Sequence, residues 1–180
     1  VSCEEVKKLN LYPDPTGKAL IRKLAETYEV EEENVFISNG SDDILNFSFM
    51  AFCDKDKGAA FPEISYGFYE VYADLYGVDY KKVPLKEDFS INISDYFGVS
   101  KTVVIANPNA PTGLALSLSE VEEIVKANSE DVVIIDEAYV DFGAESAVPL
   151  TKKYNNLIVV MTYSKSRSLA GGRLGFAIAH

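Results

Sequence analysis

Short segments that are apolar on both faces alternate with amphipathic helical segments along this chain of 180 residues. Residues 102–106, 132–135 and 157–162 are apolar almost throughout, whereas Leu20, Leu24 and Tyr28 recur at a helical spacing. Strands that are apolar on both faces are typical of a parallel sheet covered by helices on both sides. The sequence therefore predicts one α/β domain, with a mostly parallel sheet between helix layers.

The positions of the elements follow from the same alternation. Strands are expected at residues 34–37, 59–61, 78–83, 102–106, 132–135, 157–162 and 174–179, and helices at residues 18–30, 44–52, 66–76 and 117–128. Ser41 or Asp42 is expected to cap the second helix, and Gly77 to end the third. Ser117 and Glu120 have the spacing of a capping box at the fourth. Ligands bind beyond the carboxyl ends of such strands, so the residues that follow them are the functional candidates.

Composition excludes several kinds of chemistry. The one histidine is His180, so a Ser-His-Asp triad, a Cys-His pair or a multi-histidine metal site cannot be assembled. The net charge of −11 disfavours a nucleic acid as partner. The first residues do not form a signal peptide, and no run approaches the ~20 apolar residues that span a membrane. No membrane association and a cytoplasmic location are therefore expected.

A turn at residues 39–43, Asn-Gly-Ser-Asp-Asp, opens a helix directly after a strand. Free backbone N–H groups and the positive end of the helix dipole make such a turn a candidate phosphate site. The carboxylates of Asp42 and Asp43 would repel an anion unless they point away from it. An ordinary capped helix is the alternative interpretation.

Two further polar clusters follow strands. Residues 107–113, Asn-Pro-Asn-Ala-Pro-Thr-Gly, form a rigid loop that either presents an asparagine amide to a ligand or is a turn without one. Asp136 and Glu137 follow an apolar strand and precede Tyr139, and buried carboxylates usually meet a cation, a metal or a ligand nitrogen. A Walker B strand that binds Mg²⁺ is the rival interpretation, but the chain has no GxxxxGK[ST] segment to hold a nucleotide.

The fourth cluster, residues 162–173, carries Lys165 in a loop rich in serine and glycine. Partial desolvation lowers the pKa of such a lysine and makes it a nucleophile that can form an imine. Ser164 and Arg173 are suited to phosphate oxygens. The alternative for this segment alone is a solvated basic loop.

Together the four clusters match the parts of a pyridoxal phosphate site. The chain resembles the large domain of the fold-type I pyridoxal-phosphate-dependent aminotransferases, and among them it is most similar to histidinol-phosphate aminotransferases. The resemblance covers nearly the whole chain. It rests, in family order, on Tyr-Pro-Asp at residues 12–14, Asn-Gly-Ser-Asp at 39–42, Asn-Ala-Pro-Thr-Gly at 109–113, Asp-Glu-Ala-Tyr at 136–139, Ser-Lys at 164–165, and Arg173. Each motif is unspecific alone, and the set is highly specific.

The resemblance implies catalytic roles for three residues. Lys165 would hold pyridoxal 5'-phosphate as a Schiff base and then carry a proton between the substrate α-carbon and the cofactor. Asp136 would pair with the pyridine nitrogen and keep it protonated, and Tyr139 would donate to the ring hydroxyl oxygen.

It also implies which residues bind the cofactor. The backbone of Ser41 and Asp42 would hold the phosphate together with Ser164 and Arg173. Tyr66 matches the aromatic residue that stacks on the cofactor ring, and the alternative for it is one more aromatic residue on a packed helix.

Two further positions enter through the resemblance. Many relatives have asparagine where this chain has Ala110, so either Asn109 supplies the amide from one residue earlier or this contact is missing. Tyr12 matches a residue that reaches into the site of the neighbouring subunit, which implies a homodimer and a contact with the substrate.

The implied function is transamination between histidinol phosphate and 2-oxoglutarate, in histidine biosynthesis. A pyridoxal-phosphate-dependent threonine-phosphate decarboxylase is the alternative in the same fold, and a cofactor-binding fragment without turnover is the alternative from another class. Residues 1–180 are expected to be the large domain, without the small C-terminal domain and most of the N-terminal arm.

Overall fold

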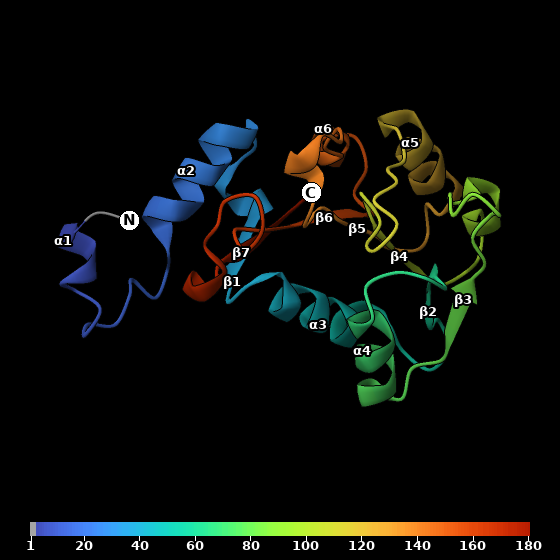
Figure 1. The fold of residues 1–180 in the computed structure, drawn as a ribbon, viewed down its shortest axis with the longest axis horizontal. Coiled ribbons are helices and arrows are strands. Elements are labelled where there is room, and N and C mark those ends of the chain that lie inside the picture. The colour runs from blue at the N-terminus through green and yellow to red at the C-terminus, as the bar shows by residue number, and fades with distance from the viewer. Residues whose placement is uncertain (1–2) are drawn as a thin grey trace.

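The computed structural model describes residues 3–180, which form one seven-stranded sheet in the order β1-β7-β6-β5-β4-β2-β3 (Figure 1). The strands from β6 through β5, β4 and β2 to β3 are parallel, and β7 runs antiparallel to both β6 and β1. The bounds are Val35–Ser38 (β1), Ala59–Pro62 (β2), Tyr80–Val83 (β3), Thr102–Ala106 (β4), Val133–Asp136 (β5), Leu157–Thr162 (β6) and Gly175–Ala179 (β7).

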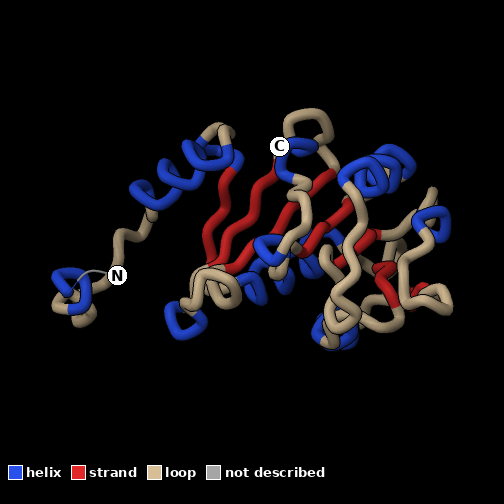
Figure 2. The backbone as a smooth tube through the Cα atoms, turned by 45° about the horizontal axis from the view of Figure 1, so that its top comes forward, coloured by secondary structure: helices blue, strands red, loops and turns tan. Residues whose placement is uncertain are grey.

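Helices cover both faces of this sheet, with α2, α5 and α6 on one side and α3 and α4 on the other (Figures 1 and 2). The α-helices are Cys3–Val6 (α1), Lys18–Tyr28 (α2), Ser41–Phe52 (α3), Phe68–Tyr76 (α4), Leu118–Ala127 (α5) and Val148–Thr151 (α6). Short 3-10 helices are Glu32–Asn34 (η1), Ile93–Tyr96 (η2), Val140–Phe142 (η3) and Ala170–Gly172 (η4). The mostly parallel sheet between helix layers that the sequence predicts is confirmed.

The central strands are apolar on both faces because each face packs under a helix layer. In β4, Val103 and Ile105 belong to the core beneath α2, α5 and α6, whereas Val104 belongs to the core beneath α3 and α4. All three side chains are fully buried. The burial explains why these segments lack the alternation of a strand with one wet face.

The predicted element boundaries are correct where local chemistry sets them. Gly77 ends α4 in the left-handed conformation, and Ser117 and Glu120 form a capping box at the start of α5. The predicted cap of α3 is wrong, because Ser41 and Asp42 are the first residues of the helix. The cap position is Gly40, which has no side chain to offer, so the first turn of α3 is left without a side-chain cap.

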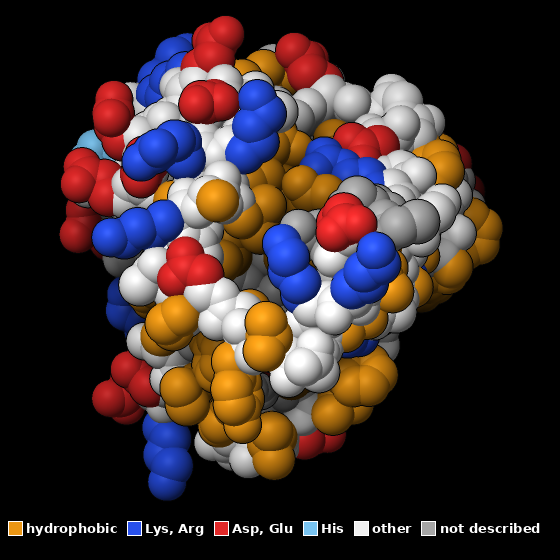
Figure 3. Space-filling view, turned by 90° about the vertical axis from the view of Figure 1, so that its left-hand side faces the viewer, with side chains coloured by type: hydrophobic (Ala, Val, Ile, Leu, Met, Phe, Trp, Pro, Cys, Tyr) orange, Lys and Arg blue, Asp and Glu red, His pale blue; other side chains and the backbone are white. Residues whose placement is uncertain are grey.

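An N-terminal segment that carries α1 projects away from the sheet (Figures 1 and 2). It exposes large apolar side chains, at Val6, Leu9, Leu11 and Tyr12. Figure 3 looks at this end of the molecule, and hydrophobic side chains gather in the lower half of the face that it shows. None of the helices in residues 3–180 is both long and apolar enough to cross a bilayer.

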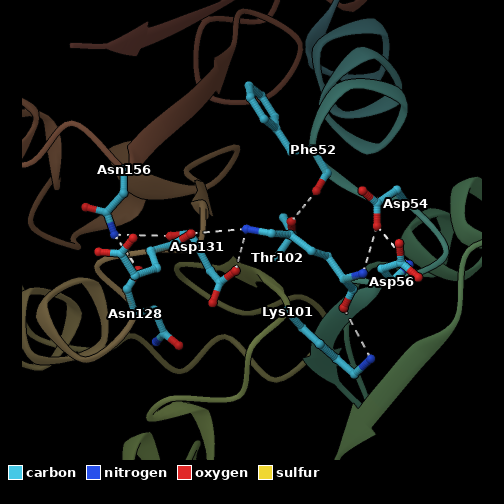
Figure 4. Close-up of polar contacts among 10 residues, drawn as sticks. Phe52, Asp54, Asp56, Lys101, Thr102, Asn128, Asp131 and Asn156 are labelled. Carbon is cyan, nitrogen blue, oxygen red and sulfur yellow. Dashed lines mark hydrogen bonds and ion pairs between the residues drawn. The ribbon is translucent and has the colours of Figure 1, made fainter.

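Polar side chains at the amino ends of the strands bond to one another and to nearby backbone carbonyls (Figure 4). Lys57 Nζ donates to Asp131 Oδ1 at 2.8 Å, and the Thr102 hydroxyl donates to the carbonyl of Phe52 at 2.8 Å. The amide of Asn156 donates to three backbone carbonyls, one of them that of Asn128 at 2.9 Å. These contacts close the amino edge, and the candidate chemistry lies at the opposite edge.

Candidate active site

A cavity of about 200 Å³ lies where β4, β5 and β6 end and α3 begins. Parallel strands bring their carboxyl ends to one edge of the sheet, so loops that are distant in the chain meet there. The cavity lining contains every predicted site residue except Asn109 and Tyr12: Ser41, Asp42, Tyr66, Asp136, Tyr139, Ser164, Lys165 and Arg173. Five further residues complete it: Ala106, Ala110, Ala138, Thr162 and Ala170.

Asp136 is the last residue of β5 and is 4% exposed. Burial raises the pKa of its carboxyl group to about 6, although hydrogen bonds from Tyr69 and from the backbone of Ala138 and the charge of Lys165 all favour the ionised form. The Tyr69 hydroxyl donates to Oδ2 at 2.8 Å, and the Ala138 N–H donates to Oδ1 at 3.1 Å. A carboxyl group held in this way is suited to meeting a protonated ligand nitrogen.

Glu137, the neighbour of Asp136, does not line the cavity. Its carboxyl group accepts hydrogen bonds from the Ser146 hydroxyl at 2.6 Å and from the Ala147 N–H. Burial raises its pKa to about 7. The two neighbouring acidic residues therefore have different roles. Asp136 lines the cavity, whereas Glu137 binds the segment that leads into α6.

Lys165 lies in the loop after β6, and its Nζ is 5.2 Å from the ring centroid of Tyr139. Tyr139 follows β5, so two neighbouring strands deliver the amine and the phenol to one place. Thr162, at the end of β6, donates a hydrogen bond to the Ser164 hydroxyl at 3.1 Å. The amine therefore lies over the ring of Tyr139, in a cavity that the hydroxyl-bearing Thr162 and Ser164 also line.

The start of α3 is the part of the cavity that suits an anion, since the first N–H groups of a helix have no partner within it. Arg173 lies against this turn, and a Cβ on Gly40 would come within 2.5 Å of its Nη2 atom. The start of β7 is equally close, because a Cβ on Gly175 would be 2.4 Å from the backbone nitrogen of Ser41. Two glycines thus let an arginine and a strand approach a helix N-terminus.

Asp42 sits at the same turn with its carboxylate already paired. Arg173 Nη2 lies 3.4 Å from Oδ2, and the Tyr66 hydroxyl donates to Oδ1 at 2.8 Å. Burial of the phenol and this bond to the carboxylate raise the pKa of Tyr66. The ring of Tyr66 stacks on Phe68 at 5.6 Å and also lines the cavity. The charge of Asp42 is offset by Arg173, which reduces its repulsion of an anion.

Asn109 and Tyr12 are not brought to the cavity. The Asn109 amide donates to the carbonyl of Ile64 at 2.9 Å, and its side-chain oxygen accepts from the Ser65 hydroxyl at 2.8 Å. Ala110 lines the cavity instead. Tyr12 is 100% exposed on the projecting N-terminal segment, so it has no role within one copy of the site.

Tyr69 is the main site residue that sequence reasoning missed. It is fully buried on α4, three residues after Tyr66, and it bonds directly to Asp136. Tyr66 lies two residues before α4, and its ring meets that of Tyr69 edge-on at 5.6 Å. On the helix predicted at residues 66–76 the three-residue spacing would place both tyrosines on one face, which is the signal that could have found Tyr69. Ala106, Thr162 and Ala170 carry no such signal, because small residues at strand ends are common.

Comparison with known proteins adds to this geometry. The model of the family described as aminotransferase class I and II matches residues 3–180. A histidinol-phosphate aminotransferase of Brachyspira hyodysenteriae is 55% identical over 173 residues, which are 96% of this chain and 49% of that protein. The chain spans about half the length of the curated relatives it matches.

Solved structures show the same likeness. The histidinol-phosphate aminotransferase of Clostridium acetobutylicum gives a TM-score of 0.86 at 28% identity, over 98% of this chain and 54% of that one. The enzyme of that name from Sinorhizobium meliloti, in complex with pyridoxal-5'-phosphate, shares the fold with a TM-score of 0.89 at 22% identity, over 98% of this chain and 50% of that one. The chain belongs to the class I and II aminotransferase family.

Proposed function

We propose that the cavity binds pyridoxal 5'-phosphate and that the chain is the large domain of an aminotransferase. One observation carries the proposal: a buried carboxyl group, a lysine amine and a helix N-terminus with an arginine converge on one cavity from segments far apart in the sequence. These groups fit three of the polar features of the cofactor, which are its ring nitrogen, its aldehyde and its phosphate.

Each residue then has a role set by its position. Lys165 binds the cofactor covalently through Nζ, and Asp136 faces the ring nitrogen with a carboxyl group that Tyr69 and the Ala138 N–H keep oriented. A protonated ring nitrogen supplies the cation that a buried carboxylate requires, so it holds Asp136 ionised. Tyr139, whose ring lies beside the Lys165 amine, donates to the ring hydroxyl oxygen.

The remaining residues hold the cofactor in place. The N–H groups of Ser41 and Asp42 bind the phosphate together with the Ser164 hydroxyl and the Arg173 guanidinium. Tyr66 covers the ring. The Asn109 amide is engaged by Ile64, so we propose that it shapes the loop that presents Ala110 to the cavity.

When bound, pyridoxal phosphate withdraws electrons from the substrate α-carbon. Lys165 would act as the base that removes the proton from the α-carbon, once the substrate amine has taken its place on the cofactor and left Nζ as a free amine.

The substrate pair that we propose is histidinol phosphate and 2-oxoglutarate, in histidine biosynthesis. The names of the relatives support this choice. Those relatives are about twice as long as the chain. We propose a homodimer, because the fully exposed Tyr12 and the apolar residues beside it can reach a second copy. The location that we propose is the cytoplasm.

A coupled assay tests the substrate. The chain is mixed with pyridoxal phosphate, histidinol phosphate and 2-oxoglutarate, and glutamate is measured, with Lys165→Ala as control. Glutamate formed by the wild type alone supports the proposal. Release of CO₂ from threonine phosphate in place of glutamate would indicate the decarboxylase. Cofactor binding with neither product would identify a cofactor-binding fragment.

A further inference from the structure

Arg167 lies in a pocket of aromatic rings beside the loop of Lys165. Its guanidinium carbon is 4.6 Å from the ring centroid of Tyr163 and 5.7 Å from that of Phe176. Its Nη2 donates to the Tyr28 hydroxyl at 2.8 Å. Tyr28 ends α2 and Phe176 belongs to β7, so one side chain joins the loop after β6 to two other elements.

A carboxylate holds the other side of the same guanidinium. Arg167 Nε is 3.3 Å from Asp141 Oδ2, and the Ser166 hydroxyl donates to the same oxygen. Asp141 lies in η3, two residues after Tyr139, and Arg167 lies two residues after Lys165. The ion pair therefore joins the two segments that carry the phenol and the amine of the site.

The backbone hydrogen bonds of the loop join it only to itself and to the start of β7. Ser168 donates to the carbonyl of Lys165 and Leu169 to that of Tyr163, and Tyr163 itself donates to the carbonyl of Leu174. Ser168 and Arg173 have φ values of 52° and 48°, a left-handed conformation that residues other than glycine rarely adopt. Contacts outside the loop must favour this shape.

We propose that Arg167 and Asp141 are positioning residues, which fix the loop so that the Lys165 amine stays over Tyr139 at the cavity. The inference rests on the proposed role of Lys165. The Arg167–Asp141 ion pair is called the clamp below. Its side chains are 29% and 38% exposed, whereas those of the pair of Arg22 and Glu32 are 66% and 52% exposed, so the clamp is the more buried pair. Arg22→Gln is thus a matched control that removes an arginine ion pair elsewhere.

Two measurements test the proposal. Both are made on Arg167→Gln, Asp141→Asn, the double variant and the control Arg22→Gln. The first is hydrogen exchange of residues 163–173 without cofactor, followed by mass spectrometry. The second is the rate at which pyridoxal phosphate attaches to Lys165, trapped by borohydride. Each clamp variant should exchange faster in this loop only, and should label Lys165 about tenfold more slowly. The double variant should resemble Arg167→Gln, because that change already breaks the ion pair together with the bond to Tyr28.

The two single variants also separate positioning from a simple charge effect. Arg167→Gln removes a positive charge near Lys165 and Asp141→Asn removes a negative one, so a field effect would shift the labelling rate in opposite directions. Positioning predicts that both variants slow it. Arg167→Lys, which keeps a partner for Asp141, should restore part of the rate.

The possible outcomes are distinguishable. Exchange and labelling like those of the wild type in both single variants would overturn the proposal, as would rate changes of opposite sign. If the wild type takes no label at Lys165, the proposed function fails, and the exchange measurement still decides whether the clamp holds the loop. If Arg167→Gln does not fold, Asp141→Asn makes the same test while the guanidinium stays on its aromatic rings.

Discussion

The Tyr69 hydroxyl donates a 2.8 Å hydrogen bond to Oδ2 of Asp136, which joins the buried face of α4 to the end of β5. The bond favours the ionised carboxylate and so opposes the effect of burial on its pKa. Tyr69→Phe should therefore raise the pKa of Asp136 above its value of about 6, by about one pH unit.

Carbon-13 NMR of labelled aspartate carboxyl groups, recorded against pH without cofactor, measures this change. Tyr76→Phe is the matched control, because Tyr76 lies on the same helix and bonds to Asn46. An unchanged Asp136 titration in Tyr69→Phe would show that this hydroxyl does not set the charge of the site.

Glu137 makes the stability of the fold depend on pH. Its pKa is about 7 in the folded chain against an ordinary 4.5, so the protonated group favours folding. The stability it contributes is complete below pH 4.5 and is lost as pH rises through 7, by up to about 3 kcal/mol.

Glu137→Gln keeps an oxygen to accept from the Ala147 N–H and sets an NH₂ donor against the Ser146 hydroxyl, and it should remove this part of the pH dependence. Urea unfolding between pH 4.5 and 8 measures it, with Glu145→Gln as an exposed control. The free energy of unfolding of the wild type should fall relative to that of Glu137→Gln as pH rises. If the free energies of unfolding of the two proteins change in parallel with pH, this would contradict the raised pKa of Glu137.

Arg173 should recognise the cofactor through its phosphate. Arg173→Leu should weaken binding of pyridoxal phosphate by about 2 kcal/mol, the scale of a charge-assisted contact, and should leave the binding of pyridoxal nearly unchanged. Calorimetry with both ligands on both proteins isolates the coupling between arginine and phosphate. Equal losses for the two ligands would place Arg173 outside the phosphate site, and Arg22→Leu controls for the loss of a positive charge.

Gly175 permits the close approach of β7 to α3. A Cβ there would meet the backbone of Gly40 and Ser41 at 2.4 Å, so Gly175→Ala should lower the free energy of unfolding by roughly 1–3 kcal/mol and weaken phosphate binding. Gly171→Ala is the control, because its Cβ would meet nothing within 4 Å. Thermal unfolding and titration with pyridoxal phosphate measure both effects, and a Gly175→Ala protein that behaves like Gly171→Ala would refute the contact.

Local signals explain how much of the fold the sequence predicts. Strands β4 and β6 have the expected bounds, because an unbroken apolar run between polar residues leaves little choice. The antiparallel direction of β7 has no local signal, since it depends on how the loop with Lys165 turns the chain back. The start of α3 was misplaced because Gly40 rather than a polar side chain precedes the helix.

The same distinction holds for the candidate site. Asp136 ends an apolar strand, and Lys165 and Arg173 lie in the loop that follows another. These positions made them candidates, and the resemblance to the family supplied their roles. The direction of the Asn109 amide is set by Ile64, which is 45 residues away, and the role of Tyr69 depends on the burial of Asp136, 67 residues away. Contacts of that range appear only in the folded chain.

The central claim is that Lys165 is the residue that binds pyridoxal phosphate. The chain is incubated with the cofactor and reduced with borohydride, and the labelled peptide is located by mass spectrometry. Label on Lys165 in the wild type, and its loss in Lys165→Ala without transfer to another lysine, is the predicted result. A label of full intensity on a different lysine in the wild type, or one that persists in Lys165→Ala, would contradict it.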